Sequence, residues 1–467
     1  MKRILTAAQM KQADRNTIET MGVPSLVLME RAALSCVEEL QNGTWDTGKV
    51  LAVCGPGNNG GDGAAIARIL KTKGVDAELF CLGNPEKYSE GMRAQKKIAE
   101  NYGVREVKNP DFREYTVIID AIFGIGVSRP LAGEYRRAVE AICASGVPVL
   151  AVDIPSGIHT DTGEVLDAAV KARATVTFAC AKPGLLFDPG KRYAGEVLVR
   201  DIGIGFDAGE EETPWYGSVE KEDLDRFLTR TPMGNKGTFG KVLVIGGAVG
   251  YSGAPYLAAS GAVHSGCGLV FLGVPESLWA VEAMKCISAM PFPLAEKEGG
   301  LSCKALPDLR EKLAECDVLA LGPGLGHGES AVRLVHTLLD ETSKPIVLDA
   351  DGINALEGHI DSLDGRRAPT ILTPHAGEFA RLTGRPLPLE DPLTAARDFA
   401  RDHRCVLVLK GHRTVTAAPD GRAWINTTGN PGMSKGGSGD VLAGLILALL
   451  GQGWEPELAA RDGVYLH

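Results

Sequence analysis

The sequence lacks any segment expected to cross a membrane or to direct secretion. Its longest apolar run, residues 441–450, is too short to span a bilayer. The chain begins with basic residues, but Gln9, Lys11, Gln12 and Asp14 follow at once, so the apolar centre of a signal peptide is missing. We therefore expect a soluble, cytoplasmic protein.

The chain also lacks an excess of positive charge. It has 49 Lys and Arg against 59 Asp and Glu, which gives a net charge of −10. This balance argues against a broad basic surface for nucleic acid or for an anionic membrane. Small anionic ligands remain possible, because a few backbone amides can bind a phosphate even in an acidic protein. We expect small-molecule substrates, no nucleic-acid or membrane partner, and assembly into a homo-oligomer.

Closely spaced cysteines are missing as well. The ten cysteines are scattered singly, without a C-x-x-C pair, a pattern that indicates reduced and mostly buried thiols in a reducing compartment. Aromatic residues make up only 6% of the chain, whereas there are 58 glycines. This composition favours an α/β protein in which tight turns join strands to helices.

The sequence does contain a recurring order of apolar strand, glycine-rich loop and helix. In the first half, strands are expected at residues 49–54, 116–120 and 147–153. The second half repeats the order, with strands expected at residues 241–245, 317–321, 345–349, 370–372 and 406–409. Continuous apolar strands that alternate with helices predict parallel sheets covered on both faces.

An acidic stretch that ends in proline separates the two halves. Residues 207–214 read Asp-Ala-Gly-Glu-Glu-Glu-Thr-Pro, and such a charged segment without apolar periodicity is typical of a linker. We place the boundary near residue 210, with domains at residues 1–210 and 216–467. Residues 463–467 have the pattern of a helix interior without a cap. We therefore expect the natural chain to continue further, the alternative being a helix that ends at the chain terminus.

The motif Asn-Asn-Gly-Gly-Asp-Gly at residues 58–63 lies between an expected strand and a helical pattern at residues 64–70. At a helix start, free backbone N–H groups and the helix dipole favour a phosphate, and glycine lets the backbone approach closely. The motif is neither a G-x-G-x-x-G fingerprint nor a Walker A loop. A plain glycine turn is the alternative, although it would need neither the two asparagines nor the aspartate.

Asp120 and Asp153 also stand at the carboxyl ends of expected strands, the edge at which open α/β sheets bind their ligands. An aspartate in this position could act as an acid or a base, or it could only cap the turn that follows.

These motifs together resemble NAD(P)H-hydrate epimerases. The resemblance covers about residues 1–205 and implies a Rossmann-like three-layer α/β/α domain. Its segments are Leu-Thr-Ala-Ala-Gln-Met at residues 5–10, Leu-Met-Glu at 28–30, Asn-Asn-Gly-Gly-Asp at 58–62, Gly-Ile-Gly-Val-Ser-Arg-Pro at 124–130 and Val-Asp-Ile-Pro-Ser-Gly at 152–157.

The resemblance also implies a set of site residues. Asp153 would be catalytic and would contact the hydrated nicotinamide. A potassium ion would take oxygen ligands from Asn59, Asp120 and Ser156, a donor set that suits a weakly charged cation better than zinc or copper. The dinucleotide substrate would contact Asn58, Asn59, Gly60, Gly61, Asp62, Gly124, Ile125, Gly126, Val127, Ser128, Arg129, Pro130 and Asp153.

In the second half, Asn-Pro-Gly-Met-Ser-Lys-Gly-Gly-Ser-Gly-Asp at residues 430–440 precedes the apolar helical run 441–450. Glycines at a helix start form an anion site from main-chain amides, and Asp440 projects into it. An aspartate beside a phosphate is unfavourable unless it handles a proton, which makes Asp440 a candidate base. A glycine-rich helix cap alone would not place a carboxylate there. Lys410, after an expected strand, offers a cation, although such a lysine is usually only a solvated charge.

This arrangement resembles ribokinase-like folds and, more narrowly, the ADP-dependent NAD(P)H-hydrate dehydratases, over about residues 220–467. The narrower resemblance rests on residues 235–241, 253–255 and 348–354. It implies that the hydrate contacts Ala254, Gly324, Gly326, His375 and the catalytic Asp440. It further implies that ADP contacts Lys410, Gly411, His412, Arg413, Thr414, Asn430, Pro431, Gly432, Met433, Ser434, Lys435, Gly436, Gly437, Ser438 and Gly439.

Both halves in one chain resemble the bifunctional NAD(P)H-hydrate repair enzymes, an isomerase joined to a hydro-lyase. The resemblance implies epimerisation of the R and S hydrates of NADH and NADPH in the first domain. It implies ADP-dependent dehydration of the S hydrate in the second, with AMP and phosphate as by-products. Potassium and ADP, with magnesium, are the expected cofactor and co-substrate. The alternative is a ribokinase-like small-molecule kinase attached to a non-catalytic binding module.

Overall fold

The computed structural model describes residues 2–205, 216–228 and 230–467, with side chains left out at 225–228. The chain divides into two compact units, Arg3–Thr213 and Pro214–His467, the latter joined by the first two residues. The expected linker at residues 207–214 lies outside the described residues. No helix in the part that the structure describes is long and apolar enough to cross a membrane.

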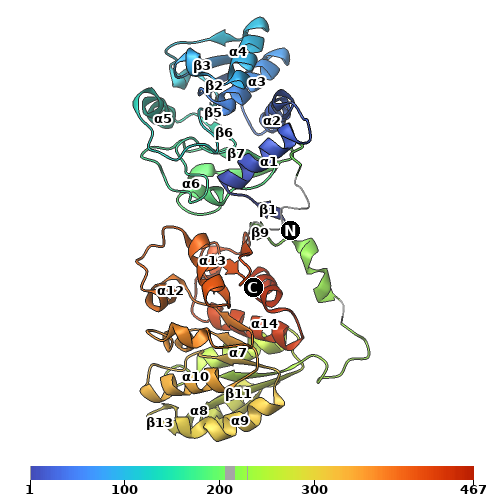
Figure 1. Cartoon of the computed structure of the whole chain (residues 1–467), viewed down its shortest axis with the longest axis vertical. Coiled ribbons are helices and arrows are strands. Elements are labelled where there is room, and N and C mark those ends of the chain that lie inside the picture. Colours follow the sequence, from blue (N-terminus) through green and yellow to red (C-terminus); the bar gives the residue numbers. More distant parts are fainter. Residues whose placement is uncertain (1, 206–215, 229) are drawn as a thin grey trace. The chain divides into compact units, whose positions relative to one another are not determined.

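The N-terminal unit is built on a parallel sheet with the strand order β4-β3-β2-β5-β6-β7-β8 (Figure 1). Its strands are β1 (Lys2–Ile4, at the chain start and outside this sheet), β2 (Lys49–Cys54), β3 (Asp76–Cys81), β4 (Arg105–Glu106), β5 (Val117–Ala121), β6 (Val149–Val152), β7 (Ala174–Phe178) and β8 (Glu196–Arg200). Its helices are α1 (Ala7–Glu19), α2 (Ser25–Leu40), α3 (Asn58–Thr72), α4 (Glu90–Asn101), α5 (Gly133–Ser145) and α6 (Gly190–Ala194).

Helices cover both faces of this sheet. Val50 and Ala52 of β2 pack in one core with α2, α3 and α4. Leu51 and Val53, which alternate with them, pack in a second core with α5. Because successive side chains of a strand point to opposite faces, the two cores lie on opposite sides of the sheet. The unit is therefore a three-layer α/β/α domain, as expected.

The C-terminal unit contains a larger sheet with the order β9-β20-β19-β18-β17-β16-β15-β10-β11-β12. Its strands are β9 (Tyr216–Ser218), β10 (Lys241–Ile245), β11 (Leu269–Pro275), β12 (Met290–Leu294), β15 (Val318–Leu321), β16 (Ile346–Leu348), β17 (Thr370–Leu372), β18 (Val406–Leu409), β19 (Val415–Ala417) and β20 (Ala423–Ile425), and a small hairpin joins β13 (Glu296–Lys297) to β14 (Gly300–Leu301). Its helices are α7 (Gly253–His264), α8 (Glu276–Lys285), α9 (Leu306–Glu315), α10 (Glu329–Glu341), α11 (Asp351–Asn354), α12 (Ala376–Thr383), α13 (Pro392–Asp402), α14 (Ser438–Gly451) and α15 (Pro456–Leu466).

Helices α7, α14 and α15 pack against Val242 and Val244 of β10 in one core. Leu243 and Ile245 point to the opposite face and are fully buried too. The sheet strands from β12 through β11, β10, β15, β16 and β17 to β18 pair in parallel, whereas β18, β19 and β20 form an antiparallel meander. The sheet is therefore parallel as expected for most of its width, and the meander is a feature that the sequence pattern did not predict.

The expected strands are confirmed within one or two residues of their predicted ends. Helix α3 differs from the prediction, because it begins at Asn58 and not near residue 64. The whole Asn-Asn-Gly-Gly-Asp-Gly motif therefore belongs to the first turns of the helix. Glycine is needed there because a side chain would collide with neighbouring atoms: a Cβ on Gly60 would overlap the carbonyl oxygen of Gly55.

Candidate active sites

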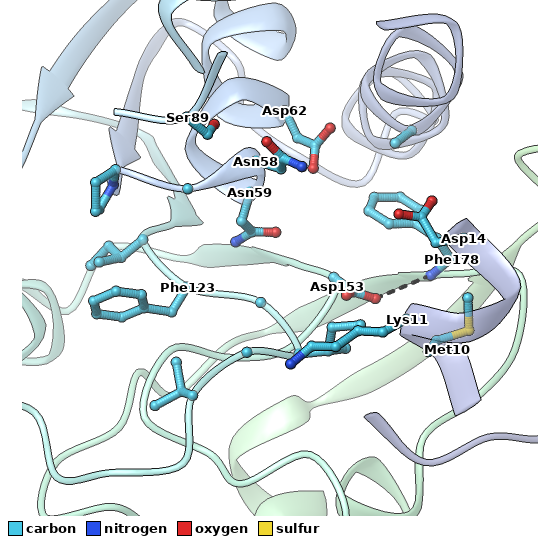
Figure 2. A pocket seen from close by; sticks show the side chains of 18 of the residues that line it. Met10, Lys11, Asp14, Asn58, Asn59, Asp62, Ser89, Phe123, Asp153 and Phe178 are labelled. Carbon is cyan, nitrogen blue, oxygen red and sulfur yellow. Dashed lines mark hydrogen bonds between the residues drawn. The ribbon is translucent and has the colours of Figure 1, made fainter. Parts of the chain in front are cut away.

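A cavity of about 1320 Å³ lies at the carboxyl edge of the N-terminal sheet. Its walls come from α1 and α2, the start of α3, residues 122–132 and the ends of β6 and β7 (Figure 2). Ligand cavities for drug-sized molecules are usually about 300 to 1,000 Å³, so this one has room for a larger ligand. The predicted site residues that line it are Asn58, Asn59, Asp62, Gly124, Ile125, Gly126, Val127, Ser128, Arg129, Pro130 and Asp153.

Gly60 and Gly61 do not line this cavity. A Cβ on Gly61 would come within 2.9 Å of the sulfur of Met29 in α2, just as one on Gly60 would strike Gly55. These two glycines let α3 pack closely against its neighbours within the protein. The structure thus gives both glycines a packing role, and their contact with the dinucleotide stays a prediction.

Asp153, the first residue after β6, is held in one position by a buried lysine. Lys182 is 1% exposed, and its ammonium donates hydrogen bonds to Asp153 Oδ1 (2.6 Å), Thr177 Oγ1 (2.7 Å) and the Phe178 carbonyl oxygen (2.9 Å). The Thr177 hydroxyl donates to the same Asp153 oxygen at 3.0 Å. Asp153 has φ +67°, an uncommon conformation for a residue with a side chain, in the turn that leaves β6. Its carboxylate is thus fixed at the cavity wall.

Two further carboxyl groups face the same end of the cavity, Asp62 from α3 and Asp14 from α1 (Figure 2). Burial raises the pKa of Asp62 well above its usual value, and the charges of Asp153 and Asp14 add to this effect. Burial also raises the pKa of Asp14, again with a contribution from Asp153. The environment therefore favours a proton on the carboxyl groups that lack a cationic partner.

Asp120 and Ser156 form a buried polar centre next to Phe123, a residue of the cavity wall whose N–H donates to the Ser156 hydroxyl (2.9 Å). The Ser156 hydroxyl donates to Asp120 Oδ1 (2.6 Å), and the Ser156 N–H donates to Asp120 Oδ2 (2.8 Å). Burial raises the pKa of Asp120 to about 6, although hydrogen bonds from Ser156 and from the Ile122 N–H oppose this. Asn59 also presents a buried Nδ2 without a hydrogen-bond partner. In the part of the chain that the structure describes, no cationic side chain contributes to the pKa of Asp120, so a bound monovalent cation would compensate a carboxylate that burial otherwise disfavours.

The three residues are compatible with potassium on chemical grounds. Their side chains offer carboxylate, hydroxyl and amide oxygens, the donor types that hard cations take. Among the residues that the structure describes, no group of three or more His, Cys, Asp or Glu could hold a metal ion. That finding concerns sites built from His, Cys, Asp and Glu, such as zinc sites. It does not concern a site that also uses amide and hydroxyl oxygens.

The C-terminal sheet carries a second lysine–aspartate pair at its own carboxyl edge. Asp349, Thr373 and Lys410 are the residues directly after the neighbouring strands β16, β17 and β18. Asp349 Oδ1 accepts from the Thr373 hydroxyl (2.7 Å) and from the Lys410 ammonium (2.8 Å). Burial acts to lower the pKa of Lys410, but nearby carboxylates, Asp349 first, outweigh it and raise the pKa.

Asp440 stands in the first turn of α14, close to this pair. A Cβ on Gly439 would lie 3.1 Å from the Lys410 nitrogen, so the start of α14 and the lysine are neighbours. Burial raises the pKa of Asp440 to about 6, which Asp349 reinforces and Lys410 opposes. A carboxyl group with such a pKa can accept and release a proton near neutral pH.

The structure brings the two loops predicted to bind ADP together. Residues 410–414 form the turn between the antiparallel strands β18 and β19. The Arg413 guanidinium donates to the carbonyl oxygen of Thr427 (2.8 Å), next to the segment 430–437. Within that segment Asn430 accepts from the Gly432 N–H and the Ser438 hydroxyl donates to the Met433 carbonyl oxygen. These contacts pre-form the loop before the start of α14.

Ala254 and Gly324 are also neighbours, since a Cβ on Gly324 would lie 3.1 Å from the Ala254 Cβ. The Gly326 N–H donates to Asp351 (2.8 Å). His375 caps α12, with Nδ1 accepting from the N–H groups of Gly377 and Glu378, and it pairs with Lys410 through a backbone bridge. His375 therefore has a structural role as a helix cap, beside the predicted site.

Lys182 and the Lys410–Asp349 pairing were not predicted as parts of the sites. Lys182 follows β7 by four residues and stands between apolar residues, in Ala-Cys-Ala-Lys-Pro-Gly-Leu-Leu. An isolated lysine among apolar residues, just past a strand end, is the signal that was available. Lys410 was singled out only as a nucleotide contact, and Asp349 only as part of a motif.

Two α/β units, each with a lysine–aspartate pair and a further carboxyl group at the sheet edge, indicate a protein with two sites for small ligands. Residues 25–184 match the family described as YjeF-related protein N-terminus, and residues 242–467 match the family NAD(P)H-hydrate dehydratase. The chain is 40% identical to the bifunctional NAD(P)H-hydrate repair enzyme of Moorella thermoacetica, over 99% of this chain and 91% of that protein. It is 38% identical to that of Thermofilum pendens, over 100% of this chain and 90% of that protein.

The chain therefore belongs to the bifunctional NAD(P)H-hydrate repair enzymes. Among solved structures, it is similar to the ADP/ATP-dependent NAD(P)H-hydrate dehydratase from Bacillus subtilis co-crystallised with ATP and Mg²⁺. That similarity has a TM-score of 0.44 and 34% sequence identity, and covers 51% of this chain and 82% of that chain.

We expect Lys182→Met to destabilise the protein by about 3 to 5 kcal/mol, because removing one member of a buried ion pair leaves the other charge unpaired. The double variant Lys182→Met with Asp153→Asn should recover part of this loss. Denaturant unfolding of both variants and of wild type measures the difference. A control, Arg192→Met, removes an exposed pair with Asp188 and should leave the unfolding midpoint unchanged. A double variant no more stable than Lys182→Met would show that the pair is not the cause.

Proposed function

We propose that the N-terminal domain, residues 1–210, interconverts the R and S hydrates of NADH and NADPH. The C-terminal domain, residues 216–467, then dehydrates the S hydrate with ADP and releases NAD(P)H, AMP and phosphate. The observation that carries the proposal is the placement of two carboxyl groups at the sheet edges: Asp153 is paired there with the buried Lys182, and Asp440 lies beside the Lys410–Asp349 pair. Location in the cytoplasm and homo-oligomeric assembly stay predictions.

The N-terminal cavity offers what a dinucleotide needs. The first N–H groups of α3, at Asn58 and Asn59, are free for a phosphate, and the helix dipole favours negative charge there. The loop 124–130 and Lys87 line the same cavity. Asp153, fixed by Lys182, would contact the hydrated nicotinamide ring as the proton acceptor. A potassium ion held by Asn59, Asp120 and Ser156 would supply positive charge beneath the loop.

In the C-terminal site, the start of α14 and Lys410 would hold the phosphates of ADP, with residues 410–414 and 430–439 around the nucleotide. Magnesium would accompany it, because a divalent cation neutralises charge on a transferring phosphate. Ala254, Gly324, Gly326 and His375 would contact the hydrate.

The proposed dehydration begins with proton transfer to Asp440. The ring hydroxyl loses its proton to this carboxylate as its oxygen bonds to the terminal phosphorus of ADP, and the bridging bond breaks to release AMP. The ring nitrogen then expels the phosphate, and loss of a proton from the adjacent carbon restores the dihydronicotinamide. A phosphate that stayed on the product would instead define a kinase, the alternative function.

The test is to incubate the protein with both epimers of NADPH hydrate and ADP, following NADPH absorbance and AMP release. Wild type should recover all the NADPH, with one AMP and one phosphate for each molecule restored. Asp440→Asn should slow recovery by about 10² to 10⁴ because the base is lost, yet still bind ADP through main-chain amides. The wild-type dehydration rate should fall as pH drops through about 6, where Asp440 becomes protonated.

Asp153→Asn serves as the matched control and should recover only the S half of the mixture. A phosphorylated dinucleotide that accumulates in wild type would establish the kinase in place of the dehydratase. Near-normal turnover of Asp440→Asn would show that Asp440 is not the base.

We expect potassium to raise the thermal unfolding midpoint relative to tetramethylammonium at equal ionic strength, because a ligand bound only by the folded state stabilises it. The increase should be present above about pH 6 and lost below it. Burial raises the pKa of Asp120 to about 6, and its protonation removes the charge that attracts the cation. Asp120→Asn should abolish the potassium dependence. A midpoint that does not depend on the cation at either pH would contradict the site, and epimerisation should respond in parallel.

A further inference from the structure

Asp62 is a buried carboxyl group of the N-terminal cavity without a partner. It stands in the second turn of α3, is 9% exposed and lines the same cavity as Asp153. Neither a hydrogen bond nor an ion pair reaches its carboxyl oxygens from the residues that the structure describes. Asp153, by contrast, accepts hydrogen bonds from both Lys182 and Thr177. A polar group that is buried at a cavity wall and left unpaired is costly, which points to a use for it.

The charges around Asp62 are of one kind. Burial is the main cause that raises the pKa of Asp62. The charges of Asp153, which follows β6, and of Asp14 on α1 raise it further. The charge of Asp62 also raises the pKa of two nearby thiols, those of Cys36 on α2 and Cys54 on β2. Lys11 of α1 lines the cavity as well, but it is not among the groups that change the pKa of Asp62. The Lys182 ammonium is hydrogen-bonded to Asp153. Burial and like charge thus favour the protonated form of Asp62.

We propose that Asp62 and Asp153 form the acid–base pair of the epimerase, with Asp62 as proton donor and Asp153 as proton acceptor. Lys182 and Thr177 are positioning residues that keep Asp153 in place. The proposal rests on the epimerase function proposed above. Its physical basis is that one carboxyl group is paired with an ammonium and the other is not, and a pair whose environments differ in this way divides the acid and base roles.

The chemistry of the hydrate fits such a pair. Its hydroxylated ring carbon is bonded to both an oxygen and the ring nitrogen, so the ring can open there as a cyclic hemiacetal does. Asp153 takes the hydroxyl proton, and the carbon–oxygen bond becomes a carbonyl. The carbon–nitrogen bond breaks with its electron pair going to nitrogen, which receives the proton of Asp62.

Rotation about the adjacent carbon–carbon bond then turns the other face of the aldehyde toward the nitrogen. The reverse proton transfers close the ring as the other epimer: Asp62 takes the nitrogen proton and Asp153 returns one to the oxygen. Both carboxyl groups recover their starting states, so the cycle needs no oxidant, reductant or further reactant.

The test uses the full chain and one purified epimer of NADPH hydrate, without ADP, and separates the epimers by chromatography. Asp62→Asn should slow interconversion about 10² to 10⁴-fold, the usual effect of losing a general acid. Binding of the hydrate, measured by calorimetry, should change only a few-fold because the amide keeps the shape. Dehydration of the S hydrate by the other domain should be unchanged, which controls for the amount of active protein, and Asp62→Glu should restore part of the epimerase activity.

The pH profile separates a proton donor from a merely structural residue. Wild-type kcat/KM for epimerisation should fall as pH rises through the raised pKa of Asp62, since the donor must be protonated. In Asp14→Asn the fall should begin at lower pH, because one of the like charges that raises the Asp62 pKa is gone. The residual activity of Asp62→Asn should lack this fall.

Three outcomes decide the proposal. Interconversion by Asp62→Asn within tenfold of wild type, or an unchanged fall at high pH in that variant, would overturn the pair while leaving the epimerase function intact. A wild-type protein that does not interconvert the epimers would instead refute the epimerase function itself.

Discussion

An ammonium held against a buried or nearly buried aspartate at the carboxyl end of a strand is the interaction on which both sites depend. In the N-terminal unit, Lys182 and Thr177 both donate hydrogen bonds to Asp153. In the C-terminal unit, Lys410 and Thr373 both donate to Asp349. Each set comes from adjacent parallel strands, whose carboxyl ends lie at one edge of the sheet. The α/β topology thus brings together residues that are distant in sequence, and burial without such pairing would be too costly for either charge.

The pairing has a consequence for the carboxyl groups that are left out of it. Burial raises the pKa of Asp62 and of Asp440, and each has a paired aspartate nearby whose charge adds to the effect. Each unit therefore offers one carboxylate with a fixed charge and one carboxyl group able to exchange a proton. In the N-terminal unit the paired Asp153 itself faces the cavity, whereas in the C-terminal unit Asp349 orients Lys410 and Asp440 is the proposed base. The same arrangement thus supports two different reactions.

Much of this organisation could be predicted from the sequence, because apolar strands before glycine loops are periodic and local signals. The strand ends, the positions of Asp120 and Asp153 near them, and that of Asp440 at a helix start followed from that pattern. The roles of these residues came from the resemblance to a family and not from spacing. Lys182 escaped prediction because a single lysine in a loop is usually solvated, and only the folded chain shows that it is buried.

Gly60 and Gly61 show a second difficulty in predicting the role of a residue from sequence alone. Glycines before a helix are typical of phosphate loops, but the same residues also allow a helix to pack tightly, and here α3 begins at Asn58 and uses them for packing. The antiparallel meander from β18 to β20, which shapes the loop 410–414, depends on pairing between short strands. Such pairing leaves little trace in local composition.

The most direct test of the division between paired and unpaired carboxyl groups is an infrared difference spectrum of wild type against Asp62→Asn at neutral pH. The carbonyl stretch of a protonated carboxylic acid should be present in wild type and missing in the variant. Loss of only carboxylate bands on substitution would show that Asp62 is ionised, and would contradict the account.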